Sequence, residues 1–302
     1  MAAAEQTGLR GDVLHAEPMS RHTSWRVGGP AERFFKPADL DDLAAFLTAL
    51  PEDVPVFWLG LGSNLLVRDG GIKGVVIAGS AVSKALDDLG GHRVRVGSSI
   101  PCTRLARQCI RWGYGPSEFF AGIPGSVGGA LTMNAGAHGG ETWERVESVV
   151  TIDRRGQTRT RPAADFEVGY RSVALPAGEW FVEATMAFDP SVDPSMQRQK
   201  EMLERRKTTQ PLGLPSCGSV FRNPPGDHAA RLIEAAGLKG YRLGGAEVSP
   251  KHANFIINTG DATAADIEGL IAHVQNTVEA AHGIRLLHEV RIVGESTTGV
   301  SS

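Results

Sequence analysis

The spacing of apolar and polar residues predicts a chain that alternates between helices and strands. Residues 39–50 place leucine and phenylalanine at helical intervals, with Asp39 suited to the N-cap and Pro51 lying just beyond the end. Short apolar or alternating runs, which are typical of buried and half-buried strands, follow this segment. These strands are expected over 54–60, 74–80 and 93–99, and a second helix over 101–113.

The later pattern predicts a mixed α and β second half. Residues 262–282 have the length of a long helix, with Asp261 or Thr263 as its cap and Gly283 at its end. Residues 121–140 are so rich in glycine that we expect no regular element there. The other expected elements are a hairpin over 148–161, a strand over 180–188, a polar connector helix from about 194, a helix over 227–237, and strands over 253–260 and 286–294.

The composition is that of a globular protein with a small net charge. Of the 302 residues, 41% are hydrophobic and 22% charged, and the formal net charge is −3. This charge gives no general attraction to nucleic acid or to an anionic membrane, so neither is an expected partner. The three cysteines fit neither a zinc site nor a disulfide framework, which favours the cytoplasm. Without an apolar signal segment, residues 1–17 and 297–302 are expected to be flexible tails.

The stretch GLGSNLLV, which begins at Gly60 and follows an apolar run, has the composition of a phosphate-binding turn. It is not a dinucleotide fingerprint of the G-x-G-x-x-G kind, because Leu65 stands where the third glycine belongs and no helix follows. A glycine-rich hairpin without a ligand is one interpretation. The other is a nest of backbone N–H groups around Gly62, completed by Ser63 and Asn64, that holds a phosphate oxygen.

A second glycine run, GIPGSVGGA around Ser126, favours the ligand interpretation. Two such runs, each leaving an apolar segment, suit the two phosphates of a dinucleotide. The cofactor is then expected between two lobes. The small residues of MNAGAHGG, which begins at Met133, would let a flat ring system pack against the backbone.

These motifs resemble the UDP-N-acetylenolpyruvoylglucosamine reductase family. The resemblance continues through TSWRVGGPAERF, GYRSV, QPLGLPSCGSVFRNPPG, GGAEVSPKHANFIIN and LLHEVRIVGE, in order, over nearly the whole chain. It implies an α+β fold, with a two-lobed FAD-binding domain of the vanillyl-alcohol-oxidase type and a C-terminal α+β substrate domain. The expected domains are lobe 1 over 18–80 with 286–296 returning to it, lobe 2 over 81–195, and the substrate domain over 200–285.

The resemblance implies non-covalent FAD as the cofactor and NADPH as the co-substrate. No histidine has metal-ligand spacing, so no metal is expected. The cofactor-binding residues expected from the glycine runs and the resemblance are Gly60, Gly62, Ser63, Asn64, Leu65, Gly122, Ile123, Pro124, Gly125, Ser126, Gly129, Asn134, Gly136 and Ala137.

Three residues gain a catalytic role only through the resemblance. By itself Ser219 reads as a turn former, Arg171 as a surface arginine, and Glu289 as either a sheet-edge or a functional acid. The family positions imply a proton donor at Ser219, an arginine facing substrate and flavin at Arg171, and a catalytic glutamate at Glu289. Cys217 has no paired base in view and is expected to be a small buried residue.

The resemblance also implies substrate contacts at Tyr170, Arg222 and Asn223. Lys207, Arg242 and Lys251 are candidates for the UDP group, and each could equally be solvated. Only a connector helix separates residue 188 from the PLGLPSCGS segment. The chain is therefore expected to be of the family's shorter type, which lacks a substrate-closing tyrosine loop.

The implied activity is the NADPH-dependent reduction of UDP-N-acetylglucosamine enolpyruvate to UDP-N-acetylmuramate, for peptidoglycan synthesis. A flavin-dependent alcohol or sugar oxidase of the same fold is the alternative; its flavin would be covalent, with His138 as the candidate attachment near the glycine segment. A nucleotide-binding regulator is a third possibility, and it would not need Ser219, Arg171 and Glu289 together. A monomer is expected, since no amphipathic stretch requires a partner.

Overall fold

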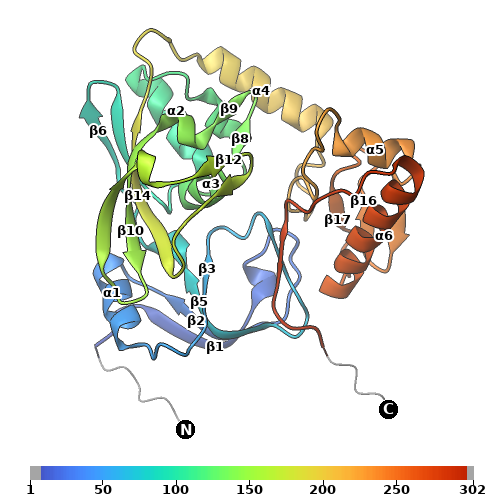
Figure 1. Ribbon diagram of the computed structural model, residues 1–302, viewed down its shortest axis with the longest axis horizontal. Coiled ribbons are helices and arrows are strands. Elements are labelled where there is room, and N and C mark those ends of the chain that lie inside the picture. The colour runs from blue at the N-terminus through green and yellow to red at the C-terminus, as the bar shows by residue number, and fades with distance from the viewer. Residues whose placement is uncertain (1–7, 298–302) are drawn as a thin grey trace. The chain divides into compact units, whose positions relative to one another are not determined.

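The computed structural model describes residues 8–297, and its chain divides into two compact units (Figure 1). Unit 1 combines the described part of Met1–His15 with Arg33–Gly60 and Gly74–Met202. Unit 2 combines Ala16–Glu32 and Leu61–Lys73 with the chain from Leu203 onward. Segments from both ends of the chain therefore meet in unit 2.

A four-stranded sheet, most of which belongs to unit 1, has the order β1-β2-β5-β3. Its strands are β1 (Asp12–Pro18), β2 (Pro30–Lys36), β5 (Ile72–Ala78) and β3 (Val56–Leu59), and helix α1 (Leu40–Ala49) lies between β2 and β3 in the chain. Asp39 caps α1 by accepting a hydrogen bond from Asp42 N at 3.0 Å, as the sequence predicts. Phe46 of α1 stacks on Phe35 of β2 with ring centroids 4.0 Å apart, which fixes the helix to the sheet.

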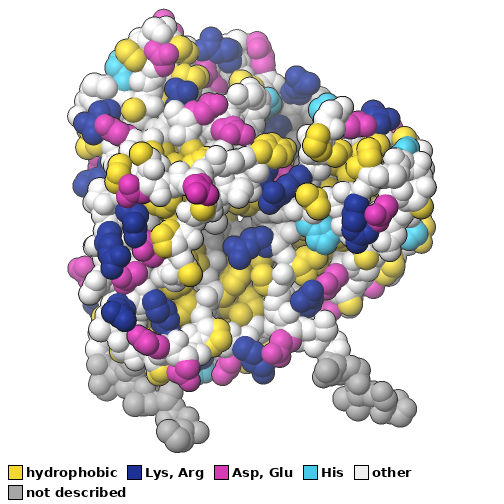
Figure 2. Space-filling view, in the orientation of Figure 1, with side chains coloured by type: hydrophobic (Ala, Val, Ile, Leu, Met, Phe, Trp, Pro, Cys, Tyr) yellow, Lys and Arg dark blue, Asp and Glu magenta, His cyan; other side chains and the backbone are white. Residues whose placement is uncertain are grey.

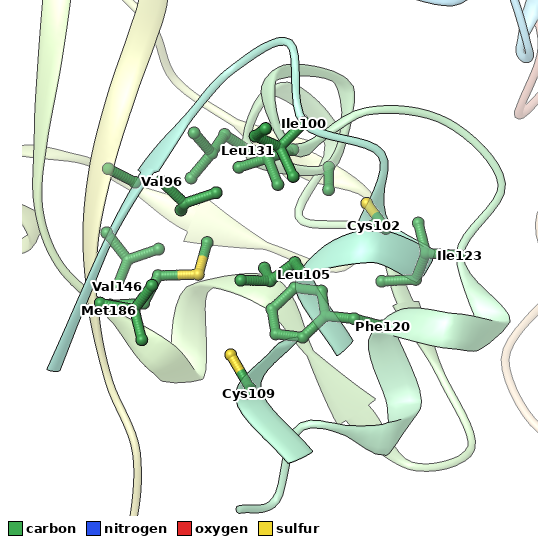
Figure 3. Close-up of a cluster of buried hydrophobic side chains, with 14 of the residues drawn as sticks. Val96, Ile100, Cys102, Leu105, Cys109, Phe120, Ile123, Leu131, Val146 and Met186 are labelled. Atoms are coloured by element: carbon green, nitrogen blue, oxygen red, sulfur yellow. The ribbon is translucent and has the colours of Figure 1, made fainter. Parts of the chain in front are cut away.

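The second sheet of unit 1 is antiparallel and has the order β11-β10-β14-β7-β6. Its strands are β11 (Thr158–Pro162), β10 (Val146–Asp153), β14 (Glu179–Ala187), β7 (Arg93–Gly97) and β6 (Leu86–Gly90). Helices α2 (Cys102–Trp112) and α3 (Val127–Met133) pack on it, and Figure 3 shows the core between them. Residues from helix and sheet meet there, among them Leu105, Phe120 and Met186.

The glycine segment contains regular structure, so the expectation of none over 121–140 is wrong. It forms the seven-residue α3, which is followed by the small hairpin of β8 (Gly136–Ala137) and β9 (Gly140–Glu141). Ser126 caps α3, and Asn134 ends it in the left-handed conformation at φ +45°. Val127 and Leu131 are buried in the core. Tertiary burial of this apolar face therefore outweighs the poor helix propensity of glycine.

Unit 2 is built on a small sheet and two helices. The sheet has the order β15-β16-β17, from β15 (Arg242–Leu243), β16 (Ala246–Val248) and β17 (Ile256–Asn258), and α5 (Ala229–Ala235) and α6 (Ala264–His282) belong to the same apolar core. Thr263, one of the two candidates, caps α6 in a capping box with Asp266, and Gly283 ends it at φ +69°.

The last strand, β18 (Arg291–Val293), pairs in parallel with β4 (Leu65–Val67). It is shorter than the expected strand over 286–294, because residues 284–290 make only an isolated bridge between His288 and Phe221. Residues 291–293 therefore lie beside a segment that was expected in lobe 1. That segment, however, belongs to unit 2 together with the C-terminal part of the chain, so the units differ from the expected domains.

The remaining differences concern the chain ends and the short elements. The expected tail over 1–17 is wrong for residues 12–17, which lie in β1, because backbone pairing orders an exposed segment that the apolar pattern does not reveal. Residues 1–7 and 298–302 lie outside the described residues. The polar connector is α4 (Met196–Thr209), and a two-stranded hairpin joins β12 (Val168–Gly169) to β13 (Ser172–Val173). Among residues 8–297, no helix is both long and apolar enough to cross a membrane.

Candidate functional site

Within unit 1, the first residue of the first glycine run lies close to the second glycine run. Gly60 follows β3, and a Cβ atom built on it would lie 3.5 Å from Ser126 Oγ at the start of α3. Gly125 adopts a φ of +117°, which an L side chain rarely tolerates. The local structure thus places a serine hydroxyl and bare backbone from distant parts of the sequence at one point.

Two backbone donors at this point are unused by the protein. Val127 N donates to Ile100 O and Gly128 N to Ser98 O, which secures the start of α3. Within the described part of the chain, the N–H groups of Gly125 and Ser126 have no acceptor. Unpaired N–H donors in a segment without bulky side chains suit the oxygens of a phosphate, so the arrangement fits the diphosphate of FAD.

Asn134 and Gly122 determine the local packing and hydrogen bonding of the second glycine segment. The Asn134 side chain is buried; its Oδ1 accepts from Trp143 N at 3.0 Å, and its Nδ2 donates to a Glu141 carboxylate oxygen at 2.7 Å. A Cβ on Gly122 would lie 2.6 Å from the Cβ of Ala137, closer than side chains approach. The Asn134 amide therefore fixes the chain around Glu141 and Trp143, and Gly122 lies too close to Ala137 for a side chain at that position.

Arg171 is attached to the same segment. Its Nη2 donates to Gly136 O at 3.0 Å and its Nη1 to Asn134 O at 3.4 Å. The residue itself has a φ of +55°, and its guanidinium carbon lies 5.1 Å from the centroid of the half-exposed Tyr170 ring. The sequence-predicted residues Arg171, Tyr170, Gly136 and Asn134 are thus brought together in unit 1.

The other predicted catalytic residues lie in unit 2, where three distant segments converge. Glu289 N donates to Val220 O at 2.8 Å, so Glu289 lies beside the residue that follows Ser219. Asn64 Nδ2 donates to Glu289 O at 2.9 Å, and Arg291 N donates to Asn64 O at 3.1 Å. The first glycine run, the Ser219 loop and the chain around Glu289 are therefore linked by backbone hydrogen bonds and by the Asn64 side chain. Ser219 and Glu289 are both half-buried.

Cys217 is excluded as a nucleophile by its surroundings. It is 3% exposed, and its Sγ contacts Leu65 O at 3.5 Å and Gly62 O at 3.8 Å. Burial raises the pKa of this thiol to about 12, so it stays protonated at neutral pH. The sequence interpretation of Cys217 as a small buried residue is confirmed.

Arg222 and Asn223 extend the Ser219 loop toward α5. Arg222 N donates to Leu287 O, and within residues 8–297 its buried Nε has no hydrogen-bond partner. Asn223 Oδ1 accepts from Ala229 N at 3.1 Å, a local capping bond that sequence reasoning missed. An asparagine shortly before a helix start is a signal that could have revealed it.

Two of the three basic candidates for the UDP group are engaged with protein groups. Arg242 is paired with Glu247 at 2.7 Å, and Lys251 Nζ donates to the carbonyl of Lys207. Figure 2 shows basic and acidic side chains interspersed over the viewed face, which matches the small net charge. Within the described residues, no group of three or more His, Cys, Asp or Glu side chains could hold a metal ion.

Arg68 and Asp69 anchor the first glycine run and were missed by the sequence analysis. Arg68 makes a forked pair with the Glu268 carboxylate at 2.8–3.2 Å, and the Asp69 carboxylate accepts from Ala264 N and Ala265 N at 3.0 Å. These interactions tie the chain just after β4 to the N-terminal part of α6. Their partners are about 200 residues away, so no local pattern points to them.

Two family models match the chain. Residues 31–161 match an FAD binding domain, and residues 210–293 match the C-terminal domain of UDP-N-acetylenolpyruvoylglucosamine reductase. The FAD-binding match contains both glycine runs, and the C-terminal match contains Ser219 and Glu289.

Full-length relatives carry the same name. The UDP-N-acetylenolpyruvoylglucosamine reductase of Alkalilimnicola ehrlichii is 60% identical over 98% of this chain and 99% of its own length. That of Methylococcus capsulatus is 56% identical over 98% and 97% of the two chains. The crystal structure of the Thermus caldophilus reductase is similar with a TM-score of 0.79 and 31% identity, and it covers 94% of this chain and 99% of that one.

Proposed function

Because the chain belongs to the UDP-N-acetylenolpyruvoylglucosamine reductase family, we propose that Ser219, Arg171 and Glu289 carry out its catalytic step. The enzyme reduces UDP-N-acetylglucosamine enolpyruvate to UDP-N-acetylmuramate with NADPH, a step of peptidoglycan precursor synthesis. FAD, when bound and reduced by NADPH, supplies the hydride for the terminal carbon of the enolpyruvyl group.

The flavin diphosphate is proposed to bind to backbone N–H groups of the two glycine runs. The unpaired N–H groups of Gly125 and Ser126, and the approach of Gly60 to Ser126, support this assignment. An uncharged nest of this kind binds anionic oxygens without a lysine. Residues 62–65 and 122–137 complete the proposed set.

Arg171 is proposed to bind the carboxylate of the enolpyruvyl group. Hydride addition leaves negative charge on the neighbouring carbon and this carboxylate, and a fixed guanidinium stabilises it. The two hydrogen bonds from Arg171 to Gly136 O and Asn134 O hold the side chain before substrate arrives. Such preorganisation is what electrostatic catalysis requires.

Ser219 is proposed to donate the proton that completes the reduction. A hydroxyl is a weak acid, so it donates only to a strong base formed beside it, such as the carbon next to the carboxylate. Glu289 is proposed to orient the reacting groups. The bond from Glu289 N to Val220 O, directly after Ser219, is the single observation that best supports a shared site for the two residues.

The localisation and the oligomeric state of the enzyme are also proposed. The enzyme is proposed to work in the cytoplasm, because its three cysteines are free and buried, as in a reducing compartment. It is also proposed to be a monomer, which light scattering of the flavin-loaded protein would measure. A mass of about twice 32.1 kDa would refute this proposal.

The catalytic assignment is tested by separating the two half-reactions. In Ser219→Ala, flavin reduction by NADPH should stay near the wild-type rate, whereas reoxidation by the enolpyruvyl substrate should slow by about 10²–10⁴-fold, the usual contribution of general acid catalysis. Arg171→Ala should also slow reoxidation. Rapid-mixing absorbance of the flavin measures each step.

Cys217→Ala is the matched control, because it removes a side chain two residues away that is buried and protonated. Its two half-reactions should stay within about twofold of wild type. Reoxidation of Ser219→Ala at the wild-type rate, or a dead Cys217→Ala, would show that the proton donor is misassigned.

A further inference from the structure

A buried side chain outside the proposed catalytic set clamps the segment after Ser219. Asn254 is 4% exposed and lies in the loop before β17. Its Oδ1 accepts from Phe221 N at 3.0 Å, and its Nδ2 donates to Phe221 O at 2.8 Å. One side-chain amide therefore pairs with both polar groups of one residue, as a neighbouring strand would.

The main chain of Asn254 adds a third bond. Val220 N donates to Asn254 O at 2.9 Å, while Val220 O accepts from Glu289 N on the other side. All four backbone polar groups of Val220 and Phe221 are thus bonded, three of them to Asn254. The peptide that follows Ser219 is held between Asn254 and the chain around Glu289.

We propose that Asn254 is a positioning residue that fixes the Ser219 hydroxyl for proton donation. The inference rests on the proposed role of Ser219. Gly218, just before the serine, has a φ of +71° and open space where a Cβ would lie, so this residue itself does not hold the serine by packing. Buried Cys217 anchors the loop before the serine, and Asn254 holds the two residues directly after it, so Asn254 contributes to the orientation of Ser219.

Asparagine has the required chemistry and size. The clamp needs one donor and one acceptor at the geometry of a peptide group, and an amide supplies both. Alanine supplies neither, and it leaves the N–H and C=O of buried Phe221 without partners. Proton transfer is sensitive to position, and a displacement of about 1 Å can cost about 10²-fold in rate.

Asn254→Ala should therefore slow flavin reoxidation by the enolpyruvyl substrate by about 10–10²-fold and leave flavin reduction by NADPH within about twofold. A second readout does not need catalysis: amide hydrogen exchange of the peptide containing residues 217–223 should be faster in the flavin-free variant. Wild-type values in both measurements would overturn the proposal.

Asn258→Ala is the matched control. Asn258 is also a buried asparagine of unit 2, but its side chain bonds to Trp25 O, Gly260 N and Ala262 N rather than to the Ser219 loop. It should lose stability without a change in the ratio of the two half-reaction rates. An equal loss of reoxidation in both variants would reduce Asn254 to a general structural role and refute the proposal.

Asn254→Asp provides a second test if the alanine variant does not fold, because aspartate has nearly the size and shape of asparagine. Its ionised carboxylate cannot donate to Phe221 O, whereas the protonated carboxyl can both donate and accept. Burial raises the pKa of such an acid, so its reoxidation rate relative to wild type should rise as the pH falls through that pKa. A ratio independent of pH would contradict the clamp.

Flavin reoxidation is also measured in Ser219→Ala, for comparison with the Asn254 variants. If its reoxidation is slow while that of Asn254→Ala and Asn254→Asp is normal, only the role of Asn254 is refuted. If its reoxidation is normal, the proposed proton donor is itself wrong, and the positioning role is refuted with it.

Discussion

At the scale of single residues, Cys217 and Ser219 have side chains of similar size but differ in burial. Cys217 is nearly fully buried against the carbonyls of Gly62 and Leu65, and burial keeps its thiol protonated. Ser219, two positions later, is half-buried. It precedes Val220, whose backbone N–H bonds to Asn254 O and whose C=O accepts from Glu289 N. A thiol is a stronger acid than a hydroxyl, but the burial of Cys217 keeps it out of reach of a substrate, whereas Ser219 is only half-buried.

A second residue-scale feature leads to a prediction about flavin binding. Gly125 has a φ of +117°, and its N–H is one of the two unused donors near Ser126. In Gly125→Val, a branched side chain should both strain the backbone, by about 1–3 kcal/mol, and block close approach of a phosphate. The purified variant should be folded by circular dichroism but nearly free of flavin by absorbance.

Gly178→Val is the control for the backbone strain alone. Gly178 also has a positive φ, +73°, but it lies in the turn before β14, with only Arg154 Cβ near its Cβ position. This variant should lose comparable stability and keep its flavin. Full flavin occupancy in Gly125→Val would count against the proposed binding site.

At the scale of elements, helix α6 is anchored by a segment from the other end of the chain. The Asp69 carboxylate accepts two N–H groups at its first turn, in addition to the Thr263 capping box. A carboxylate at this end also interacts favourably with the helix dipole. The anchor therefore joins the chain that follows the first glycine run to the longest helix of unit 2.

Asp69→Ala should lower the free energy of unfolding by about 1–2 kcal/mol, the usual effect of losing a helix cap. Urea denaturation followed by circular dichroism measures it. Asp261→Ala removes the exposed acid that the sequence left as an alternative cap, and it should change the same quantity by no more than about 0.5 kcal/mol. If the two variants were equally destabilised, the Asp69 anchor would not be contributing.

At the scale of the whole molecule, the predicted catalytic residues come from both units. Arg171 belongs to unit 1, and Ser219 and Glu289 belong to unit 2. Unit 2 itself contains chain segments separated by about 200 residues, since β4 pairs with β18. The long return of the chain is thus part of how unit 2 is assembled.

The whole protein also distinguishes the reductase from the alternative oxidase. The backbone N–H groups proposed to hold FAD form no covalent bond with it, so acid precipitation should release all of the flavin into the supernatant. The flavin absorbance of the supernatant and of the redissolved pellet measures how much flavin is released and how much stays on the protein. Yellow colour retained by the precipitated chain would indicate a covalent flavin and contradict the non-covalent site.

The sequence by itself determined the elements with strong local signals and the family. Helix α1 with its Asp39 cap, helix α2, strand β3 and the β10–β11 hairpin follow from periodicity and caps, which depend on neighbours in the chain. Tertiary structure decided the rest. Helix α3 forms in a glycine-rich segment because its apolar face is buried, and β1 forms because another strand pairs with it. The meeting of Asn64, Val220 and Glu289 depends on backbone groups and on the Asn64 amide, and it joins positions so far apart in the chain that no local pattern can single them out.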